Sequence, residues 1–137
     1  MKRLVIIDDE PELRALLAKA VAPRFECVAQ AGNGSDGIEA VQRVQPDLVL
    51  LDLGMPDMDG LECLRAIRSQ ERRVIVYTGY RGARLEAVVQ ELGAAGFVHK
   101  GATVEALLDA MVDAMASPVP PVLNRDARLR HRLHDLV

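Results

Sequence analysis

The side chains of this sequence that could do chemistry are three aspartates at the ends of short apolar runs. Asp8 and Asp9 follow residues 4–7, and Asp52 follows residues 48–51. Carboxylates that lie close together repel one another unless a cation neutralises them. A compact set of oxygen ligands favours Mg²⁺, which usually retains some waters and a phosphate oxygen. If these aspartates meet in the fold, one of them could attack a phosphoryl group and form an aspartyl phosphate.

A hydroxyl and an ammonium group follow two other apolar runs. Thr78 comes directly after residues 74–77, and Lys100 comes soon after residues 96–98. A lysine can stabilise the charge of a phosphoryl group during transfer, and a hydroxyl can donate a hydrogen bond to the phosphate that results. Taken singly, each of these residues has a plainer interpretation as a loop or surface side chain. Their joint position at the ends of separate runs favours a common site.

The elements that must position these residues are five predicted strands and five predicted helices. Continuous apolar runs indicate strands that are buried on both faces, at residues 4–7, 27–29, 48–51, 74–77 and 96–98. Apolar residues at helical spacing lie between and after them, within residues 13–21, 38–44, 61–67, 85–92 and 104–115. This alternation predicts a doubly wound α/β fold with a five-stranded parallel sheet. The carboxyl ends of such strands form the ligand crevice, where the polar residues would meet.

Local signals agree with these helix boundaries. Pro11 suits a first helical turn, Asn33 and Thr103 are candidate N-caps, and Gly93 is a candidate helix stop. The first helix has an apolar stripe that we expect to face the core, formed by Leu13, Leu16, Leu17, Ala20 and Val21.

The composition is that of one compact domain with an aliphatic core. The chain has 137 residues, of which 50% are apolar, with no Trp. No apolar run approaches the roughly 18 residues that span a bilayer, and the run near the N-terminus is too short for a signal peptide. Cys27 and Cys63 lie far apart, so we interpret them as small core residues of a reduced, cytoplasmic protein. The net charge of −3 makes the chain a poor surface for nucleic acid.

Several segments resemble the signature motifs of two-component receiver domains. They are Ile-Asp-Asp-Glu at 7–10, Asn-Gly at 33–34, Asp-Leu-Gly-Met-Pro-Asp-Met-Asp-Gly at 52–60, Thr-Gly at 78–79 and Gly-Phe-Val-His-Lys at 96–100. They match the family in order and spacing, and the similarity covers roughly residues 1–116. The motif at 52–60 is highly specific, whereas the acidic pair is only moderately so.

The resemblance implies a role for each candidate site residue. Asp52 would be the phosphoryl acceptor. Asp9, Asp52 and the Gly54 carbonyl would hold Mg²⁺, and Asp8 would act through a water. Lys100 would pair with the phosphate, Thr78 would be the switch hydroxyl that also stabilises the phosphate, and Phe97 would be the aromatic that reports the state of Thr78. From the residues alone, Phe97 could equally be a core aromatic.

The resemblance also implies an architecture and a signalling route. The sheet would have the flavodoxin-like order 2-1-3-4-5, with five helices. The phosphoryl donor would be a sensor histidine kinase or a phosphotransfer protein. The signal would reach a downstream protein target, or a second copy in a homodimer, through the surface formed by residues 85–92, 96–98 and 104–115. The only reactions implied are self-phosphorylation and autodephosphorylation, so the chain would not be an enzyme with a separate substrate.

Four positions depart from the family pattern or modulate it. Gly101 stands where the family commonly has a proline, which leaves the geometry of that loop open. Phe97 has no hydroxyl, which excludes a signal through a tyrosine oxygen. Gly54 and Tyr80 lie two residues beyond Asp52 and Thr78, so we expect them to flank the phosphate and set its lifetime. Tyr80 would shield the phosphate from water, and Gly54 would leave access open.

Residues 117–137 differ in composition from the domain at residues 1–116. The segment 117–121 is predicted to form an extended proline-rich linker. Beyond it, leucines at helical spacing favour a short basic amphipathic tail, with Arg125, Arg128, Arg130 and Arg132 between them. A single-domain regulator is the first hypothesis; the tail would then pack on the domain or mediate a dimer. The chain could instead be the receiver part of a truncated DNA-binding regulator. Direct contact with nucleic acid through the arginines is disfavoured, because the tail has no aromatic side chains for stacking.

Two further chemistries are weaker alternatives. Aspartate-based phosphatases also use an aspartate nucleophile with Mg²⁺ and lysine. Their motif has a second acidic residue two positions after the nucleophile, where this chain has Gly54. His131 and His134 have metal-compatible helical spacing, but no cysteine or acidic partners lie in a defined loop nearby, so we interpret them as solvated.

Overall fold

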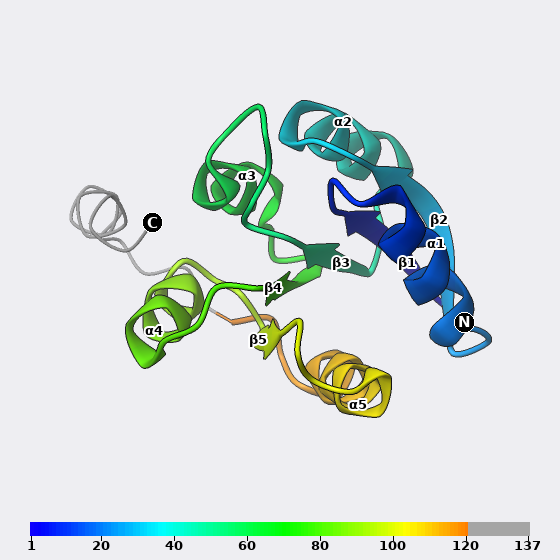
Figure 1. Ribbon diagram of the computed structural model, residues 1–137. Helices are drawn as coiled ribbons and strands as arrows, with labels where there is room; N and C mark the ends of the chain where they lie inside the picture. The colour runs from blue at the N-terminus through cyan, green and yellow to red at the C-terminus, as the bar shows by residue number, and fades with distance from the viewer. Residues whose placement is uncertain (121–137) are drawn as a thin grey trace.

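The computed structural model describes residues 1–120, as five strands and five helices that alternate along the chain (Figure 1). The strands are β1 (Lys2–Ile7), β2 (Phe25–Ala31), β3 (Leu48–Leu51), β4 (Arg73–Thr78) and β5 (Gly96–His99). The helices are α1 (Pro11–Ala20), α2 (Gly34–Val44), α3 (Gly60–Ile67), α4 (Ala83–Glu91) and α5 (Val104–Ala116). The predicted α/β fold is confirmed. The predictions for the basic tail, with its four arginines and the pair His131 and His134, lie outside the described residues.

All five strands are parallel and form one sheet in the order β2-β1-β3-β4-β5, as expected. The register aligns their carboxyl ends: Ile7 lies opposite Leu51, and Thr78 lies opposite His99. Asp8, Asp52 and Lys100 each follow the last residue of a strand, whereas Thr78 is itself the last residue of β4. The sheet therefore brings all four polar residues to one edge.

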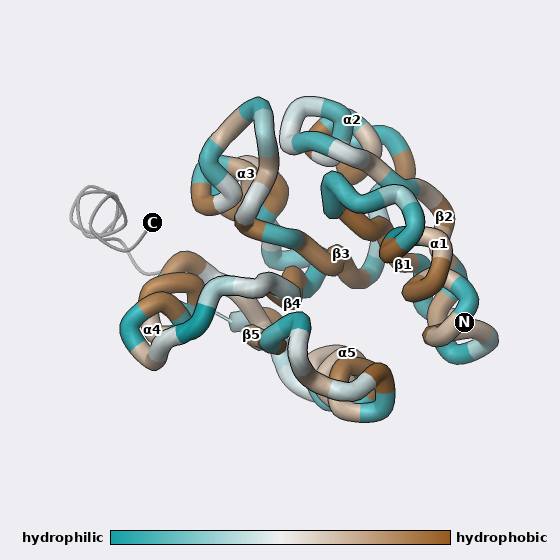
Figure 2. Tube along the Cα trace, viewed as in Figure 1, coloured by the Kyte–Doolittle hydropathy of each residue, from teal (hydrophilic) through white to brown (hydrophobic). Residues whose placement is uncertain are grey.

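The sheet separates two apolar clusters, which explains why the strand runs are continuous rather than alternating. Val5 and Ile7 face a cluster that includes residues of α2, α3 and α4. Leu4 and Ile6 face a second cluster with residues of α1 and α5. Figure 1 shows α2 and α3 on one side of the sheet and α5 on the other, and in Figure 2 the hydrophobic colouring follows β1 and β3 between these layers. Burial on both faces holds the central strands rigidly beneath the polar edge.

The helix boundaries follow the predicted signals. Pro11 is the first residue of α1, and the side chain of Asn33 accepts a hydrogen bond from the Asp36 amide at the start of α2. Thr103 caps α5 in the same way, and Gly93 follows α4 with a φ of 102°, a conformation that glycine adopts without strain. These caps fix where each helix meets the loops that carry the polar residues.

Two predictions about extent and burial were wrong. β2 covers Phe25–Ala31 rather than only 27–29, because it is an edge strand whose exposed and half-buried side chains hide its length from a search for apolar runs. Leu16 was expected in the core but is 58% exposed, whereas Leu17 is buried.

Within residues 1–120, no helix is both long and apolar enough to cross a membrane.

Candidate functional site

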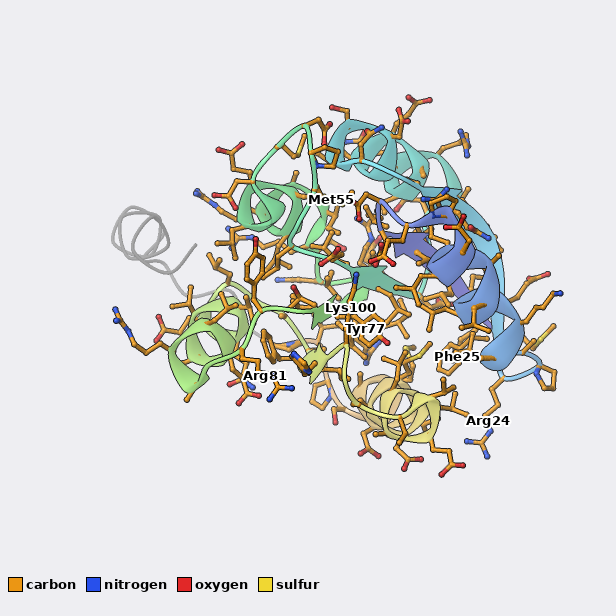
Figure 3. All side chains as sticks on the ribbon, in the orientation of Figure 1. Arg24, Phe25, Met55, Tyr77, Arg81 and Lys100 are labelled. Atoms are coloured by element: carbon orange, nitrogen blue, oxygen red, sulfur yellow. The ribbon has the colours of Figure 1, made fainter. Side chains whose placement is uncertain are left out.

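The ammonium group of Lys100 lies between the carboxylates of β1 and β3. Its Nζ is 2.8 Å from Oδ2 of Asp8 and 3.1 Å from Oδ2 of Asp52. Both aspartates are almost fully buried, with 2% and 6% of their surfaces exposed. Figure 3 labels Lys100 near the centre of the molecule. The sequence prediction that these three residues converge is confirmed by this geometry.

A hollow of about 370 Å³ opens beside this ion-pair cluster. It is lined by residues at the carboxyl ends of β1, β3, β4 and β5. They are Asp9, Glu10, Asp52, Gly54, Thr78, Gly79, Tyr80 and Lys100. Six of the residues that the sequence singled out therefore share one small cavity. Asp8 does not line the cavity, but its carboxylate pairs with Lys100, which does.

Burial and pairing act in opposite directions on the charges of this cluster. Burial raises the pKa of Asp8, and the hydrogen bonds from Lys100 and from the Glu10 amide offset this effect only in part. Burial by itself would lower the pKa of Lys100, but the hydrogen bonds to Asp8 and Asp52 outweigh it and raise that pKa. Lys100 therefore stays charged, while the Asp8 carboxylate is costly to keep ionised. A cluster of this kind gains from any further cation that reaches it.

Asp8, Asp9 and Glu10 form the part of the cluster that could hold a metal ion. Each offers one carboxylate oxygen, and these oxygens lie within 4.8 Å of one another. The donors are all oxygen atoms, as Mg²⁺ prefers, so the residues fit this ion. Sequence reasoning gave Glu10 no role, although its Oε1 lies 3.5 Å from Lys100. Its place in the acidic run directly after Asp9 was the available signal.

The backbone around Asp52 is arranged to hold its carboxylate and leave it approachable. The Gly54 amide donates a hydrogen bond to Oδ1 of Asp52 at 3.2 Å. A Cβ at Gly54 would lie 3.8 Å from Oδ2 of Asp52, which is ordinary van der Waals distance. Space beside the Asp52 carboxylate is thus open at this position, and the expected effect of Gly54 on phosphate lifetime stays a prediction. Its proposed service as a metal ligand through the carbonyl stays a prediction.

Thr78 lies in the same cavity, but Phe97 does not. The Thr78 hydroxyl accepts a hydrogen bond from the Tyr80 amide at 3.3 Å, and the Thr78 carbonyl accepts one from the Lys100 amide at 2.8 Å. Phe97 packs against the α2-α3-α4 cluster and lines a separate hollow of about 350 Å³ between α4 and β5. Phe97 is thus a partly buried aromatic that packs against the core and also lines a hollow. Its switch role stays a prediction.

Two contacts that support the site were not predicted from the sequence. Nη1 of Arg14 in α1 donates to the carbonyl oxygen of Asp8 at 2.6 Å. The carboxylate of Asp57 accepts hydrogen bonds from the amides of Gly34 and Ser35, at 2.7 and 3.0 Å. Asp57 lies in the loop after β3, so it fastens that loop to the start of α2.

The cysteines take no part in this chemistry. Cys63 is fully buried, and burial raises the pKa of its thiol to about 12. Cys27 is half-buried, and both thiols are free. Their interpretation as core residues agrees with this placement.

Comparison with known proteins agrees with the fold. The family model of the response regulator receiver domain matches residues 4–112. The chain belongs to the response-regulator receiver family. Receiver domains generally bind Mg²⁺ at an acidic pocket, and this receiver domain has an acidic cluster at the expected edge of its sheet.

Individual relatives are of two kinds. The nitrate/nitrite response regulator protein NarL of Escherichia coli K12 is 37% identical over 117 residues, which cover 82% of this chain and 54% of NarL. The chemotaxis protein CheY of Listeria monocytogenes is 34% identical over 119 residues, 83% of this chain and 98% of CheY. The chain therefore spans about half the length of NarL and nearly all of the CheY protein.

A solved structure supports the same assignment. The signal receiver domain of the putative response regulator NarL from Mycobacterium tuberculosis superposes with a TM-score of 0.77 at 30% identity. The match covers 85% of this chain and 97% of that one. The receiver fold is thus shared over the whole region that carries the site.

Proposed function

We propose that this receiver domain is a phosphorylation-dependent switch in which Asp52 accepts a phosphoryl group with the help of Mg²⁺. The observation that carries the proposal is the position of the Lys100 ammonium, 3.1 Å from the Asp52 carboxylate in an open, acid-lined cavity. A lysine held charged at this distance can neutralise a phosphoryl group that arrives at Asp52. A buried aspartate with no route to solvent could not do this, but Asp52 lines the cavity.

The transfer needs little covalent chemistry from the protein. A lone pair of an Asp52 carboxylate oxygen forms the new bond to phosphorus, while the bond from phosphorus to the donor breaks and its electron pair leaves with the donor. Lys100 would hold the negative charge of the transferred group, and the Thr78 hydroxyl, which lines the same cavity, would donate to it. Mg²⁺, held by Asp9, Asp52 and the Gly54 carbonyl with Asp8 acting through a water, would neutralise the oxygens of carboxylate and phosphate.

The proposed output surface is α4, β5 and α5. Thr78 would move toward the phosphate, and Phe97, which lines the hollow between α4 and β5, would move into the space that Thr78 leaves. Receiver domains interact with histidine kinases and with downstream effectors. For this chain we propose a sensor histidine kinase or phosphotransfer protein as donor, and a downstream protein or a second copy as target.

The proposed chemistry is limited to phosphorylation and autodephosphorylation of the domain itself, in the cytoplasm. Intact mass measured after incubation with acetyl phosphate tests it, with and without Mg²⁺. We expect one phosphate adduct in the wild type, which requires Mg²⁺ and is lost in Asp52→Asn. An adduct that persists in Asp52→Asn would contradict the proposal.

A second candidate is that the chain is the receiver part of a longer transcription regulator. The observation that favours it is the 54% coverage of the NarL protein and the 56% coverage of BvgA of Bordetella pertussis, which is named as a putative positive transcription regulator. Retention of the chain on DNA, measured across salt concentrations, would test whether residues 1–137 already contact nucleic acid. Strong retention that falls steeply with salt would favour direct contact through the basic tail. If the chain is not retained on DNA, any contact with nucleic acid would have to come from a further domain.

A further inference from the structure

The imidazole of His99 lies between the two loops that carry Thr78 and Lys100. His99 is the last residue of β5. Its Nδ1 lies 2.9 Å from the amide nitrogen of Gly101, and its Nε2 lies 3.1 Å from the carbonyl oxygen of Gly79. Because Gly79 follows Thr78 and Gly101 follows Lys100, one ring contacts the backbone beside two residues of the cavity.

Gly101 is what allows the ring to lie on this turn. A Cβ at position 101 would lie 2.8 Å from Nδ1 of His99, so a larger residue would displace the ring. The family commonly has a proline at this position, and a proline has no N–H to donate to residue 99. The glycine at position 101 and the histidine at position 99 are therefore linked by a hydrogen bond. The sequence left the geometry of the loop after β5 undetermined, and in the structure the His99 side chain closes this loop as a turn.

The hydrogen-bonding capacity of a neutral imidazole decides which contacts can coexist. The Gly101 amide is a donor, so Nδ1 must accept, and the single ring proton lies on Nε2, which donates to the Gly79 carbonyl. Nε of Arg81 lies 3.0 Å from the same Nε2. A guanidinium can donate to Nε2 only in the opposite tautomer, in which Nδ1 carries the proton and the Gly101 amide is released. Arg81 and the two backbone groups thus compete for one ring.

We propose that His99 is a positioning residue for phosphoryl transfer, a clamp that holds the Thr78 and Lys100 loops in place. The inference rests on the proposed function of Asp52, because Lys100 acts on Asp52 across 3.1 Å. Arg81, labelled in Figure 3 beside α4, lines the hollow between α4 and β5 together with Phe97 and His99. The competition for the ring therefore links the phosphate cavity to the proposed output surface.

Three substitutions separate the two bonds of the clamp. In His99→Asn the side-chain oxygen can take the place of Nδ1 and accept from Gly101, but the side chain is too short to reach Gly79. In His99→Gln the amide nitrogen can reach Gly79, and the acceptor for Gly101 is lost. His99→Leu keeps the bulk and loses both bonds. We expect His99→Leu to slow phosphorylation by acetyl phosphate about tenfold, with Asn and Gln in between.

The Mg²⁺ dissociation constant distinguishes positioning from general damage. The metal-holding residues follow β1 and β3, so we expect His99→Leu to bind Mg²⁺ within about twofold of wild type in isothermal titration calorimetry. Arg81→Ala removes the competitor and should phosphorylate at least as fast as wild type. A wild-type phosphorylation rate in His99→Leu would overturn the inference. So would a loss of Mg²⁺ affinity in step with the rate.

Amide exchange reads the clamp without any phosphorylation. In the wild type the Gly101 amide should be protected, and in His99→Leu and His99→Gln it should exchange about tenfold faster. Equal exchange in all variants would contradict the clamp whatever Asp52 does. Wild-type protein that takes no phosphate but shows this exchange pattern would contradict only the proposed function.

Discussion

At the scale of single residues, Lys100 acts as an internal counterion for two buried carboxylates. Its side chain is 19% exposed, and those of Asp8 and Asp52 are 3% and 8% exposed. Separating charges this deeply buried from their partner costs more than an exposed salt bridge contributes. In the proposed function the same three groups must also admit a phosphoryl group. The site thus combines a stabilising ion pair with an acceptor that must remain reactive.

Replacing Lys100 should therefore weaken the fold when no metal is present. We expect Lys100→Met to lower the free energy of unfolding by about 3 kcal/mol, because Asp8 and Asp52 lose their cation. Added Mg²⁺ should recover more stability in this variant than in the wild type. Urea unfolding with and without Mg²⁺ measures both effects, with Lys2→Met, at an exposed position, as the control. Equal stability of the two variants would show that Lys100 is not the counterion.

Tyr80 is the residue that sequence reasoning assigned to shielding the phosphate. It lines the cavity and is 45% exposed, so its ring is free to lie over a group on Asp52. We expect Tyr80→Ala to shorten the lifetime of the phosphorylated state, whereas Tyr80→Phe, which keeps the ring, should leave it unchanged. Decay of the adduct after removal of the donor, followed by intact mass, measures the lifetime. An unchanged lifetime in Tyr80→Ala would rule out shielding.

At the scale of elements, Asp57 joins the loop after β3 to the start of α2. The Ser35 amide, and then the Gly34 amide, lower the pKa of the Asp57 carboxyl. An anion at the beginning of a helix is also favoured by the helix dipole. Because the loop begins at Asp52, this contact helps to fix the acceptor relative to its neighbours.

The Asp57 contact predicts a dependence of stability on pH. A carboxyl whose pKa is lowered in the folded state stabilises the protein above the unfolded value, about 3.9, and this contribution is lost as pH falls through the lowered value. The unfolding temperature of the wild type should therefore fall more steeply than that of Asp57→Asn from about pH 5 to about pH 3. Asp109→Asn, at an exposed position in α5, is the control. Parallel curves for wild type and Asp57→Asn would contradict the linkage.

The sequence specified most elements because each is marked by local chemistry. Continuous apolar runs marked the three central strands β1, β3 and β4, which are mostly buried, and the half-buried edge strand β5. Asn33 and Thr103 marked helix starts with side chains that accept backbone hydrogen bonds. β2 was predicted too short because an exposed edge leaves no apolar run. The contacts of His99 and Asp57 could not be predicted, since they depend on loops that meet only in the folded sheet.

At the scale of the whole molecule, the sheet places the cavity and the proposed output surface on adjoining loops. Thr78 lines the cavity at the end of β4, and Phe97 packs beside α4 from β5. The two strands are paired, with Val76 opposite Phe97. In the proposed phosphorylated state, a shift of the β4–α4 loop would therefore reach α4 directly, because that loop leads into the helix.

Removal of the Thr78 hydroxyl should uncouple these two regions. Beryllium trifluoride, which mimics a bound phosphoryl group, should change hydrogen exchange in α4 of the wild type and of Thr78→Ser. In Thr78→Ala the mimic should still bind, but exchange in α4 should stay as in the free protein. Hydrogen exchange measured by mass spectrometry tests this coupling. A full response in Thr78→Ala would show that the signal takes another route.

The central claim is that the phosphoryl group is carried by Asp52 as an acyl phosphate. Borohydride reduces an acyl phosphate to an alcohol, so the phosphorylated aspartate becomes homoserine and can be located by peptide sequencing. We predict homoserine at position 52 only, and only after treatment with donor and Mg²⁺. Homoserine at another aspartate, or phosphate that is bound in a form borohydride does not reduce, would contradict the account.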